Sequence, residues 1–388
     1  MYAAVNYFKT LQTNIIMTGL ATAGRIFSII TAISIGIIAI LFIVLWISSS
    51  GKTRPLLDAD GHVLKASISA KLQIPVNGVQ QGMFITGKDT ANPVLLFLHG
   101  GTGMPEYFLT QKYPTGLEEH FTVCWWDRCG AGLSYHKDIP AESLTIEQAI
   151  SDAIAVTHYL RKRFKQNKIY LMGHSGGTFF GLQVADRAPE LYAAYIGIGQ
   201  MTYQLESENL SYQYVLKQYR EIGNSKMVRI LEAAPVTMAI PLPESYMRIR
   251  DKAMHELGVG TTRDMKSVMT GVFLRSWLNR EYTLREKLGF WRGKFMLDRL
   301  IWSKMIATDL RTKISRVNIP VYFLHGKYDH TVSYPMAKAY LDALNAPVKG
   351  FYTFTHSAHS PMFEEPEKME EIILNDVFNG TNGLADEN

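Results

Sequence analysis

A glycine-rich turn around Ser175 constrains the fold of this chain more than any other feature. Residues 169–172 form a short apolar run typical of a buried strand, and Gly173-His174-Ser175-Gly176-Gly177 follows directly. From Thr178 onward the pattern is that of a helix packed closely on a sheet. A serine between a strand and a helix occupies a sharp, strained turn, so the residues two positions before and after it must be small. The helix N-terminus then directs its free N–H groups toward any negative charge that forms beside Ser175.

Strand and helix patterns alternate on both sides of this turn. Alternation of this kind indicates a mostly parallel central sheet with helices on both faces. The composition, 47% hydrophobic and 19% charged, fits a globular core. Near-continuous apolar runs, typical of strands buried on both faces, occur at 93–98, 121–126, 193–198, 319–325 and 348–354.

Two segments depart from the alternation. Residues from about 66 to 88 alternate apolar and polar side chains around Asn77-Gly78, which predicts an antiparallel pair at the edge of the sheet. Residues from 200 to about 309 contain no strand-like run, which predicts a helical cap over the carboxyl edge of the sheet. We therefore expect an N-terminal segment at 1–50, an α/β core at 51–200 and 312–388, and a cap at 201–311.

The N-terminal segment carries a candidate transmembrane helix. The 22 residues Ile26–Ile47 contain no charge, and a membrane-spanning helix needs ~20 apolar residues. A cleavable signal peptide is the alternative, but its apolar core runs only ~7–15 residues. The sequence thus predicts a single-pass anchor in the lipid bilayer. Basic residues flank the span almost equally, so the side of the membrane on which the domain lies stays open.

Small residues recur at every fourth position along this span. Gly24, Ser28, Ala32 and Gly36 share one helix face, and such a ridge can support helix pairing and a homodimer. The alternative is a chance alignment, because small residues are common in membrane spans.

Three residues in the order Ser, Asp, His are candidates for a catalytic triad. Ser175 is the candidate nucleophile, and a serine hydroxyl needs a neighbouring base. Asp329 follows the strand that ends at His325, and His359 follows the last strand, so both belong to the carboxyl edge where catalytic groups gather. His356 is an alternative base, and Asp329 could instead be an ordinary turn residue.

An oxyanion that forms during acyl transfer needs two N–H donors. Gly176 offers one, and the loop His99-Gly100-Gly101 after the 93–98 strand offers the other, which we assign to Gly101. His99 is expected to be a structural hydrogen-bonding residue, and Asp127 and Arg128 to shape the adjacent loop.

Together these blocks resemble the proline iminopeptidase-like branch of the α/β-hydrolase superfamily. The resemblance runs from about Leu72 to Val377, apart from much of the cap, and implies the Ser175, Asp329 and His359 triad with oxyanion donors near Gly101 and Gly176. The blocks that carry it are 96–103, 126–134, 173–177, 325–329 and 357–366.

Three positions depart from the family pattern. Thr102 replaces the usual proline, Cys129 replaces an arginine that here lies one position earlier, and Gly176 replaces a bulky residue. In peptidases of this branch, glutamates of the cap bind the free amino terminus of the substrate. The corresponding candidates here are Glu206, Glu208 and Glu232.

The expected function is that of a membrane-anchored serine hydrolase that acts on a small-molecule or peptide substrate. The leading hypothesis is a proline iminopeptidase-like aminopeptidase. An esterase or lipase acting on membrane-associated acyl esters is the alternative, because residues 247–316 carry sixteen Lys/Arg against seven Asp/Glu with interleaved aromatic residues. A non-catalytic membrane scaffold is a third possibility. We expect no cofactor, no metal site and no nucleic-acid partner, since no ligand spacing, nucleotide motif or basic arm occurs.

Overall fold

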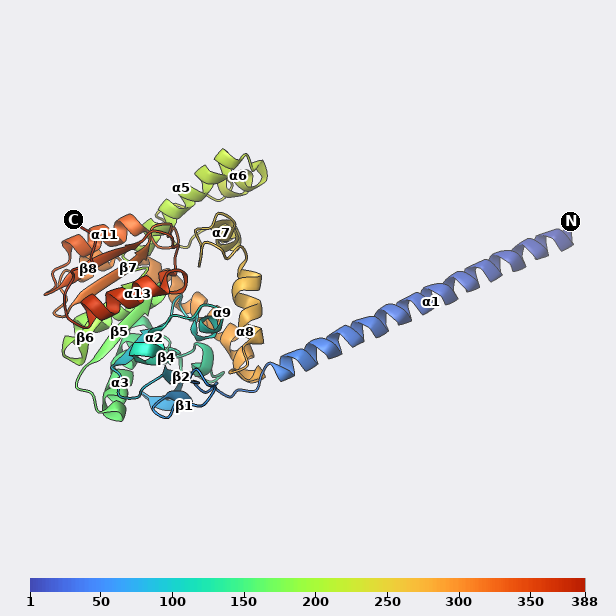
Figure 1. The fold of residues 1–388 in the computed structure, drawn as a ribbon. Helices are drawn as coiled ribbons and strands as arrows, with labels where there is room; N and C mark the ends of the chain where they lie inside the picture. The colour runs from blue at the N-terminus through green and yellow to red at the C-terminus, as the bar shows by residue number, and fades with distance from the viewer. Residues whose placement is uncertain (388) are drawn as a thin grey trace.

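The central sheet of the protein contains eight strands in the order β1-β2-β4-β3-β5-β6-β7-β8 (Figure 1). The computed structural model describes residues 1–387, without the side chains of residues 13–15. At one edge β1 (Ile68–Val76) pairs antiparallel with β2 (Val79–Gly87), and β2 pairs antiparallel with β4. The six remaining strands are parallel: β3 (Val94–Leu98), β4 (Thr122–Trp126), β5 (Ile169–His174), β6 (Tyr192–Ile198), β7 (Val321–Gly326) and β8 (Lys349–Phe354). The predicted parallel sheet with an antiparallel edge is confirmed.

Apolar side chains pack against both faces of this sheet. One cluster includes residues of α3 (Ile146–Phe164), α4 (Gly176–Arg187) and α11 (Tyr334–Ala343). A second cluster includes the 3-10 turn Tyr107–Gln111, α12 (Pro361–Glu364) and α13 (Pro366–Ile372). Strands β3 and β4 are buried along their whole length, which explains their near-continuous apolar sequences. Shorter elements are α2 (Leu117–His120), three 3-10 turns (Gly132–Ser134, Ala141–Ser143 and Pro189–Leu191) and a π-turn (Ile373–Val377).

The chain between β6 and β7 is helical. Its elements are α5 (Gln204–Ile222), α6 (Ser225–Glu232), α7 (Glu244–Glu256), the π-turn Met269–Phe273, α8 (Leu274–Leu278), α9 (Leu284–Ala307) and α10 (Leu310–Lys313). Figure 1 shows α5 and α6 extending from the sheet domain, with α7 and α8 along one side of it. A separate apolar cluster joins residues of α5, α6 and α7.

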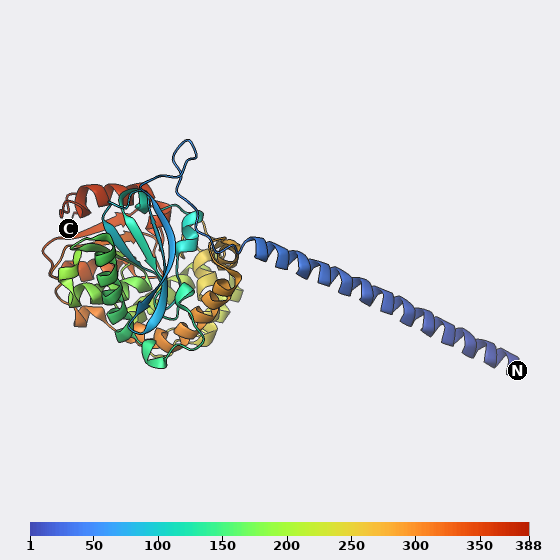
Figure 2. The same ribbon diagram turned by 90° about the horizontal axis from the view of Figure 1, so that it is seen from below.

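Helix α1 (Tyr2–Ile47) projects away from the sheet domain as one continuous 46-residue helix (Figures 1 and 2). It is long and apolar enough to cross a membrane by length and composition. The predicted span 26–47 forms its C-terminal part and ends at the same residue. A Cβ atom added at Gly24 or Gly36 would meet no other atom within 4 Å, so the ridge of small residues is open. Whether two copies pair there stays a prediction.

Candidate active site

Ser175 occupies a strained backbone conformation between β5 and α4. Its φ is +52° and its ψ is −122°, a region that residues with a side chain seldom adopt. Its N–H donates to the carbonyl of Ile198 on the neighbouring strand (2.8 Å), and its side chain is half-buried. Strain of this kind persists only where surrounding contacts over-determine it. The serine is therefore held at the carboxyl edge of the sheet.

The contacts that hold this turn are backbone contacts at glycine positions. A Cβ atom added at Gly177 would lie 1.9 Å from the carbonyl oxygen of Leu98, at the end of β3. One added at Gly176 would lie 2.3 Å from the carbonyl oxygen of Gly101. Only glycine at both positions allows the turn and the loop after β3 to approach so closely.

The same contact brings together the two proposed oxyanion donors. The nitrogen of Gly101 would lie 2.8 Å from a Cβ atom at Gly176, and Gly101 itself has a φ of +55°. Within residues 1–387, neither of these two N–H groups donates to another residue. Both are therefore available to a developing negative charge.

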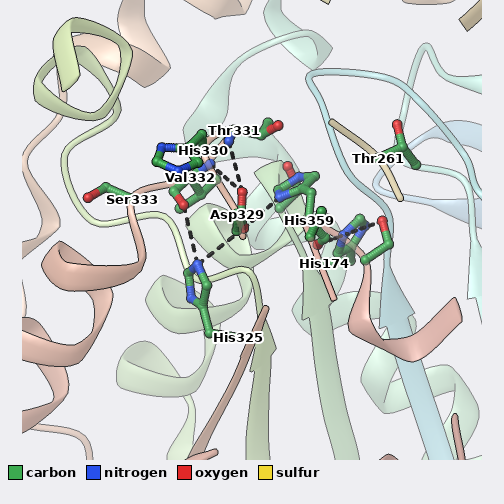
Figure 3. Close-up of polar contacts among 12 residues, drawn as sticks. His174, Thr261, His325, Asp329, His330, Thr331, Val332, Ser333 and His359 are labelled. Carbon is green, nitrogen blue, oxygen red and sulfur yellow. Dashed lines mark hydrogen bonds and ion pairs between the residues drawn. The ribbon is translucent and has the colours of Figure 1, made fainter. Parts of the chain in front are cut away.

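Asp329 lies at the centre of a buried hydrogen-bond network (Figure 3). Its Oδ2 is 2.9 Å from Nδ1 of His359 and 3.1 Å from Nε2 of His325. Its Oδ1 accepts from the N–H groups of Thr331 and Val332, each at 2.9 Å. Burial alone would raise the pKa of Asp329, but the two histidines hold this pKa well below its usual range. The carboxylate thus stays charged beside His359.

His359 is buried, and its surroundings favour the neutral form that a general base must have. Burial and the nearby charges of His174 and His325 lower its pKa below the usual value of 6.5, although Asp329 opposes them. The backbone N–H of His359 donates to the carbonyl of Gly260 at 3.2 Å, which connects the loop after β8 to the cap. Within residues 1–387, no hydrogen bond joins its ring to the hydroxyl of Ser175. Such bonds are often long in enzymes without substrate, so the Ser175–His359 contact stays a prediction.

His356, the alternative base, lies elsewhere. Its side chain is exposed, and its backbone N–H donates to Oε2 of Glu365 at 3.0 Å. The contact of His359 with Asp329 supports His359, and not His356, as the candidate base.

A second buried histidine–carboxylate pair adjoins these residues, and sequence reasoning missed it. Nδ1 of His174 lies 2.6 Å from Oε1 of Glu106, and its Nε2 donates to the main-chain oxygen of His359 at 3.0 Å. Burial opposes the charge of His174, but Glu106 raises its pKa above 6.5. His174 was visible in the sequence as the residue before the serine, whereas nothing in the sequence marked Glu106 as its partner.

Arg128 holds the loop after β3 in place, as its sequence neighbourhood suggested. Its buried guanidinium donates to the carbonyls of His99 (2.6 Å), Gly101 (3.0 Å) and Thr102 (3.2 Å). His99 accepts in turn from the N–H of Arg128 (3.2 Å), and burial lowers its pKa well below 6.5. The arginine is displaced by one position from the family pattern but still binds three carbonyl groups of the loop after β3.

All three cap glutamates proposed for amine binding are paired with arginines. Buried Glu208 makes a two-pronged pair with Arg250, at 2.6 and 2.7 Å. Glu206 lies 2.8 Å from Arg311, and Glu232 lies 2.7 Å from Arg220. Each carboxylate therefore already has an arginine partner, although Arg311 is shared with Asp309 and Arg250 with Asp251.

An exposed turn brings Asp58, Asp60 and His62 close enough together to suggest a metal site, with ligand atoms within 4.8 Å. Oδ1 of Asp58 accepts from the N–H groups of Asp60 (3.0 Å) and His62 (2.8 Å). These bonds make an Asx-type turn, which accounts for the arrangement without an ion.

The fold, and the place of the strained serine in it, define an α/β-hydrolase. The chain belongs to the serine aminopeptidase S33 family, whose model matches residues 94–366. It is 33% identical over 303 residues to a Bacillus subtilis (strain 168) protein named "Probable aminopeptidase YbaC", covering 78% of this chain and 94% of that protein. The chain is therefore a serine hydrolase.

Solved structures share the fold at lower identity. A proline iminopeptidase-related protein of Thermus thermophilus superposes with a TM-score of 0.56 at 20% identity, over 80% of this chain and 98% of its own. The proline iminopeptidase of Mycobacterium smegmatis superposes with a TM-score of 0.55 at 15% identity, with the same coverage. Both confirm the predicted fold class.

The charges around His359 predict the pH dependence of the reaction. As the predicted base, His359 would have to be neutral to accept a proton, and its pKa is lowered, so we expect half-maximal reactivity toward a fluorophosphonate below pH 6.5. In His174→Gln a positive neighbour is lost, so the pKa of His359 should rise and the midpoint should move to higher pH. The measurement is the labelling rate between about pH 4 and about pH 9, a range that brackets the titration of a histidine. His158→Gln, on the exposed surface of α3, is the control. An unmoved midpoint in His174→Gln would contradict the assigned coupling.

Proposed function

We propose that the protein is a membrane-anchored serine hydrolase in which Ser175, His359 and Asp329 act as a catalytic triad. The observation that carries this proposal is the buried 2.9 Å contact between His359 and Asp329, beside a serine in a strained turn. The anchor is α1, whose apolar C-terminal part joins the domain directly.

In the proposed mechanism, Oγ of Ser175 attacks the carbonyl carbon of the substrate while Nε2 of His359 accepts the hydroxyl proton. Asp329 accepts a hydrogen bond from Nδ1 of His359 and stabilises the imidazolium that forms. The N–H groups of Gly101 and Gly176 donate to the oxyanion. His359 then protonates the leaving group, which departs and leaves an acyl group on Ser175. In the second half of the reaction His359 accepts a proton from water, which attacks the acyl carbon, and His359 returns this proton to Oγ of Ser175 as the acid is released.

The substrate we propose first is a peptide with a free N-terminus, cleaved in the manner of a proline iminopeptidase. The S33 family and the 33%-identical protein named as an aminopeptidase support this choice.

A second candidate, hydrolysis of acyl esters, is favoured by the state of the cap glutamates. Glu206, Glu208 and Glu232, the candidates for binding a substrate ammonium, are all bound to arginines, and the Glu208 pair is buried. Releasing buried Glu208 from Arg250 would leave a buried charge unpaired, which is costly. An uncharged acyl group requires no such release.

Substitutions of the proposed triad test the mechanism. Ser175→Ala should abolish labelling by a fluorophosphonate, because the nucleophilic hydroxyl is gone, and Asp329→Asn should lower turnover about 10⁴-fold through loss of the correct histidine tautomer. His359→Gln should also lose labelling, whereas His356→Gln, its matched control, should keep it. Labelling that persists in Ser175→Ala would reject the assigned nucleophile.

Matched substrates separate the two activities. We compare kcat/KM for proline anilide, for N-acetylproline anilide and for a short-chain p-nitrophenyl ester. An aminopeptidase needs the free amine, so acetylation should lower its kcat/KM by about 10²-fold or more, the typical effect of losing a buried charged contact. Equal turnover of both anilides, or ester turnover alone, would favour the esterase.

A further inference from the structure

The C-terminal end of α1 is fixed to the cap without a long linker. Trp46 and Ile47 end the helix, and Ser50, a few residues further on, forms an antiparallel bridge with Thr283. The hydroxyl of Ser50 and the N–H of Gly51 both donate to the carbonyl of Arg280, each at 2.9 Å. The last apolar turn of the helix therefore lies next to the segment that joins α8 to α9.

Lys287 closes this junction from inside the cap. Its buried ammonium donates to the carbonyl of Ser48, to Oγ of Ser49 (2.9 Å) and to the carbonyl of Trp277 (2.6 Å). A lysine at the C-terminus of a helix also interacts favourably with the helix dipole. Burial lowers the pKa of Lys287 to about 8. One side chain thus joins α1, α8 and α9.

The outer face of α9 beside this junction carries an alternating stripe of basic and apolar residues. Leu288 and Phe295 are 43% and 57% exposed, although both are large and apolar. They alternate with exposed arginines at spacings of three and four residues, which places all five on one side of the helix. The stripe consists of Arg285, Leu288, Arg292, Phe295 and Arg299.

The neighbouring α8 segment extends this surface. Met269, Leu274 and Leu278 are 56%, 44% and 52% exposed, and Arg275 and Arg280 are exposed beside them. In Figure 1, α8 lies at the side of the domain from which α1 leaves. We call the stripe and these five residues the α8–α9 face.

The positive charge of the α8–α9 face is not neutralised within the described chain. None of its five arginines makes an ion pair with another residue of 1–387, and the three acidic residues of this segment are engaged elsewhere. Glu281 accepts from the N–H of Arg54 (2.8 Å), Glu286 pairs with Lys71 (2.9 Å), and Asp298 pairs with Lys294 (2.5 Å).

We propose that the α8–α9 face lies on the surface of an anionic phospholipid bilayer, the membrane in which α1 is anchored. This inference rests on the proposed anchor. Trp46 marks the interfacial end of the span, as tryptophan does in membrane helices. With so short a connection after Ile47, the bilayer surface must pass close to Thr283. Arginines then meet lipid phosphates, and the exposed leucines and Phe295 enter the acyl boundary, as in interfacial amphipathic helices.

The opposite side of α9 reaches the candidate active site. A Cβ atom added at Gly103, in the loop after β3, would lie 2.4 Å from Cδ1 of Leu297. The hydroxyl of Thr102 donates to Asp298. One helix thus separates the proposed lipid surface from the oxyanion loop.

Lipid-borne quenchers test this placement in the full-length protein. The native Cys124 and Cys129 are buried, so a fluorophore will react with a single introduced cysteine. The variants are Phe295→Cys on the α8–α9 face, Lys162→Cys on exposed α3 as the control, and Ile40→Cys within the span. Each is placed in nanodiscs of phosphatidylcholine and phosphatidylserine with a nitroxide-labelled lipid. We expect strong quenching at 295 and 40, and little at 162.

The outcomes separate the two proposals. Quenching at 40 with none at 295 above that at 162 would overturn the membrane placement of the α8–α9 face but leave the anchor intact. Absence of quenching at 40 would overturn the anchor and this inference together. Arg285→Gln with Arg292→Gln and Arg299→Gln should weaken quenching at 295, as should nanodiscs without phosphatidylserine. Quenching that responds to neither change would contradict recognition of anionic lipid.

Discussion

The close backbone contact between the serine turn and the loop after β3 is the constraint on which the rest of the site depends. At Gly177 and Gly176 there is no space for even one methyl group, because the carbonyls of Leu98 and Gly101 occupy it. This contact fixes Ser175 in its strained conformation and brings the two candidate N–H donors to one point. Arg128 fixes the loop after β3 in this contact, because it donates to three of the carbonyl groups of the loop.

Buried carboxylates paired with histidines surround this backbone contact. Asp329 binds two histidines, and Glu106 binds a third that also supports the main chain of His359. Asp329 lies between His325 and His359, and Glu106 binds His174 on the far side of His359, so each of these buried carboxylates has a partner. The same principle applies in the cap, where Glu206, Glu208 and Glu232 are each paired with an arginine. For that reason the charge pattern of the cap, more than the candidate triad, bears on which substrate the enzyme accepts.

The fold could be predicted because its signals are local. Buried parallel strands have continuous apolar sequences, and the elbow needs glycines at fixed spacing, so both were visible without coordinates. Partners far apart in the sequence could not be predicted: Glu106 with His174, Glu208 with Arg250, and Lys287 with the end of α1. Each of these pairs depends on how loops and helices pack. The sequence around a single glutamate or lysine does not indicate which distant residue it will contact. The assignment of Ser175, Asp329 and His359 stays a prediction until it is tested.

A crystal structure of the protein after reaction with a fluorophosphonate tests the central claim most directly. The account predicts a phosphonyl group on Oγ of Ser175, with its oxygen ~2.7–3.1 Å from the nitrogens of Gly101 and Gly176, the distance of an oxyanion hole. His359 should lie within hydrogen-bond reach of the same group and keep its contact with Asp329. An adduct on another residue, or a phosphonyl oxygen that neither glycine contacts, would contradict the account.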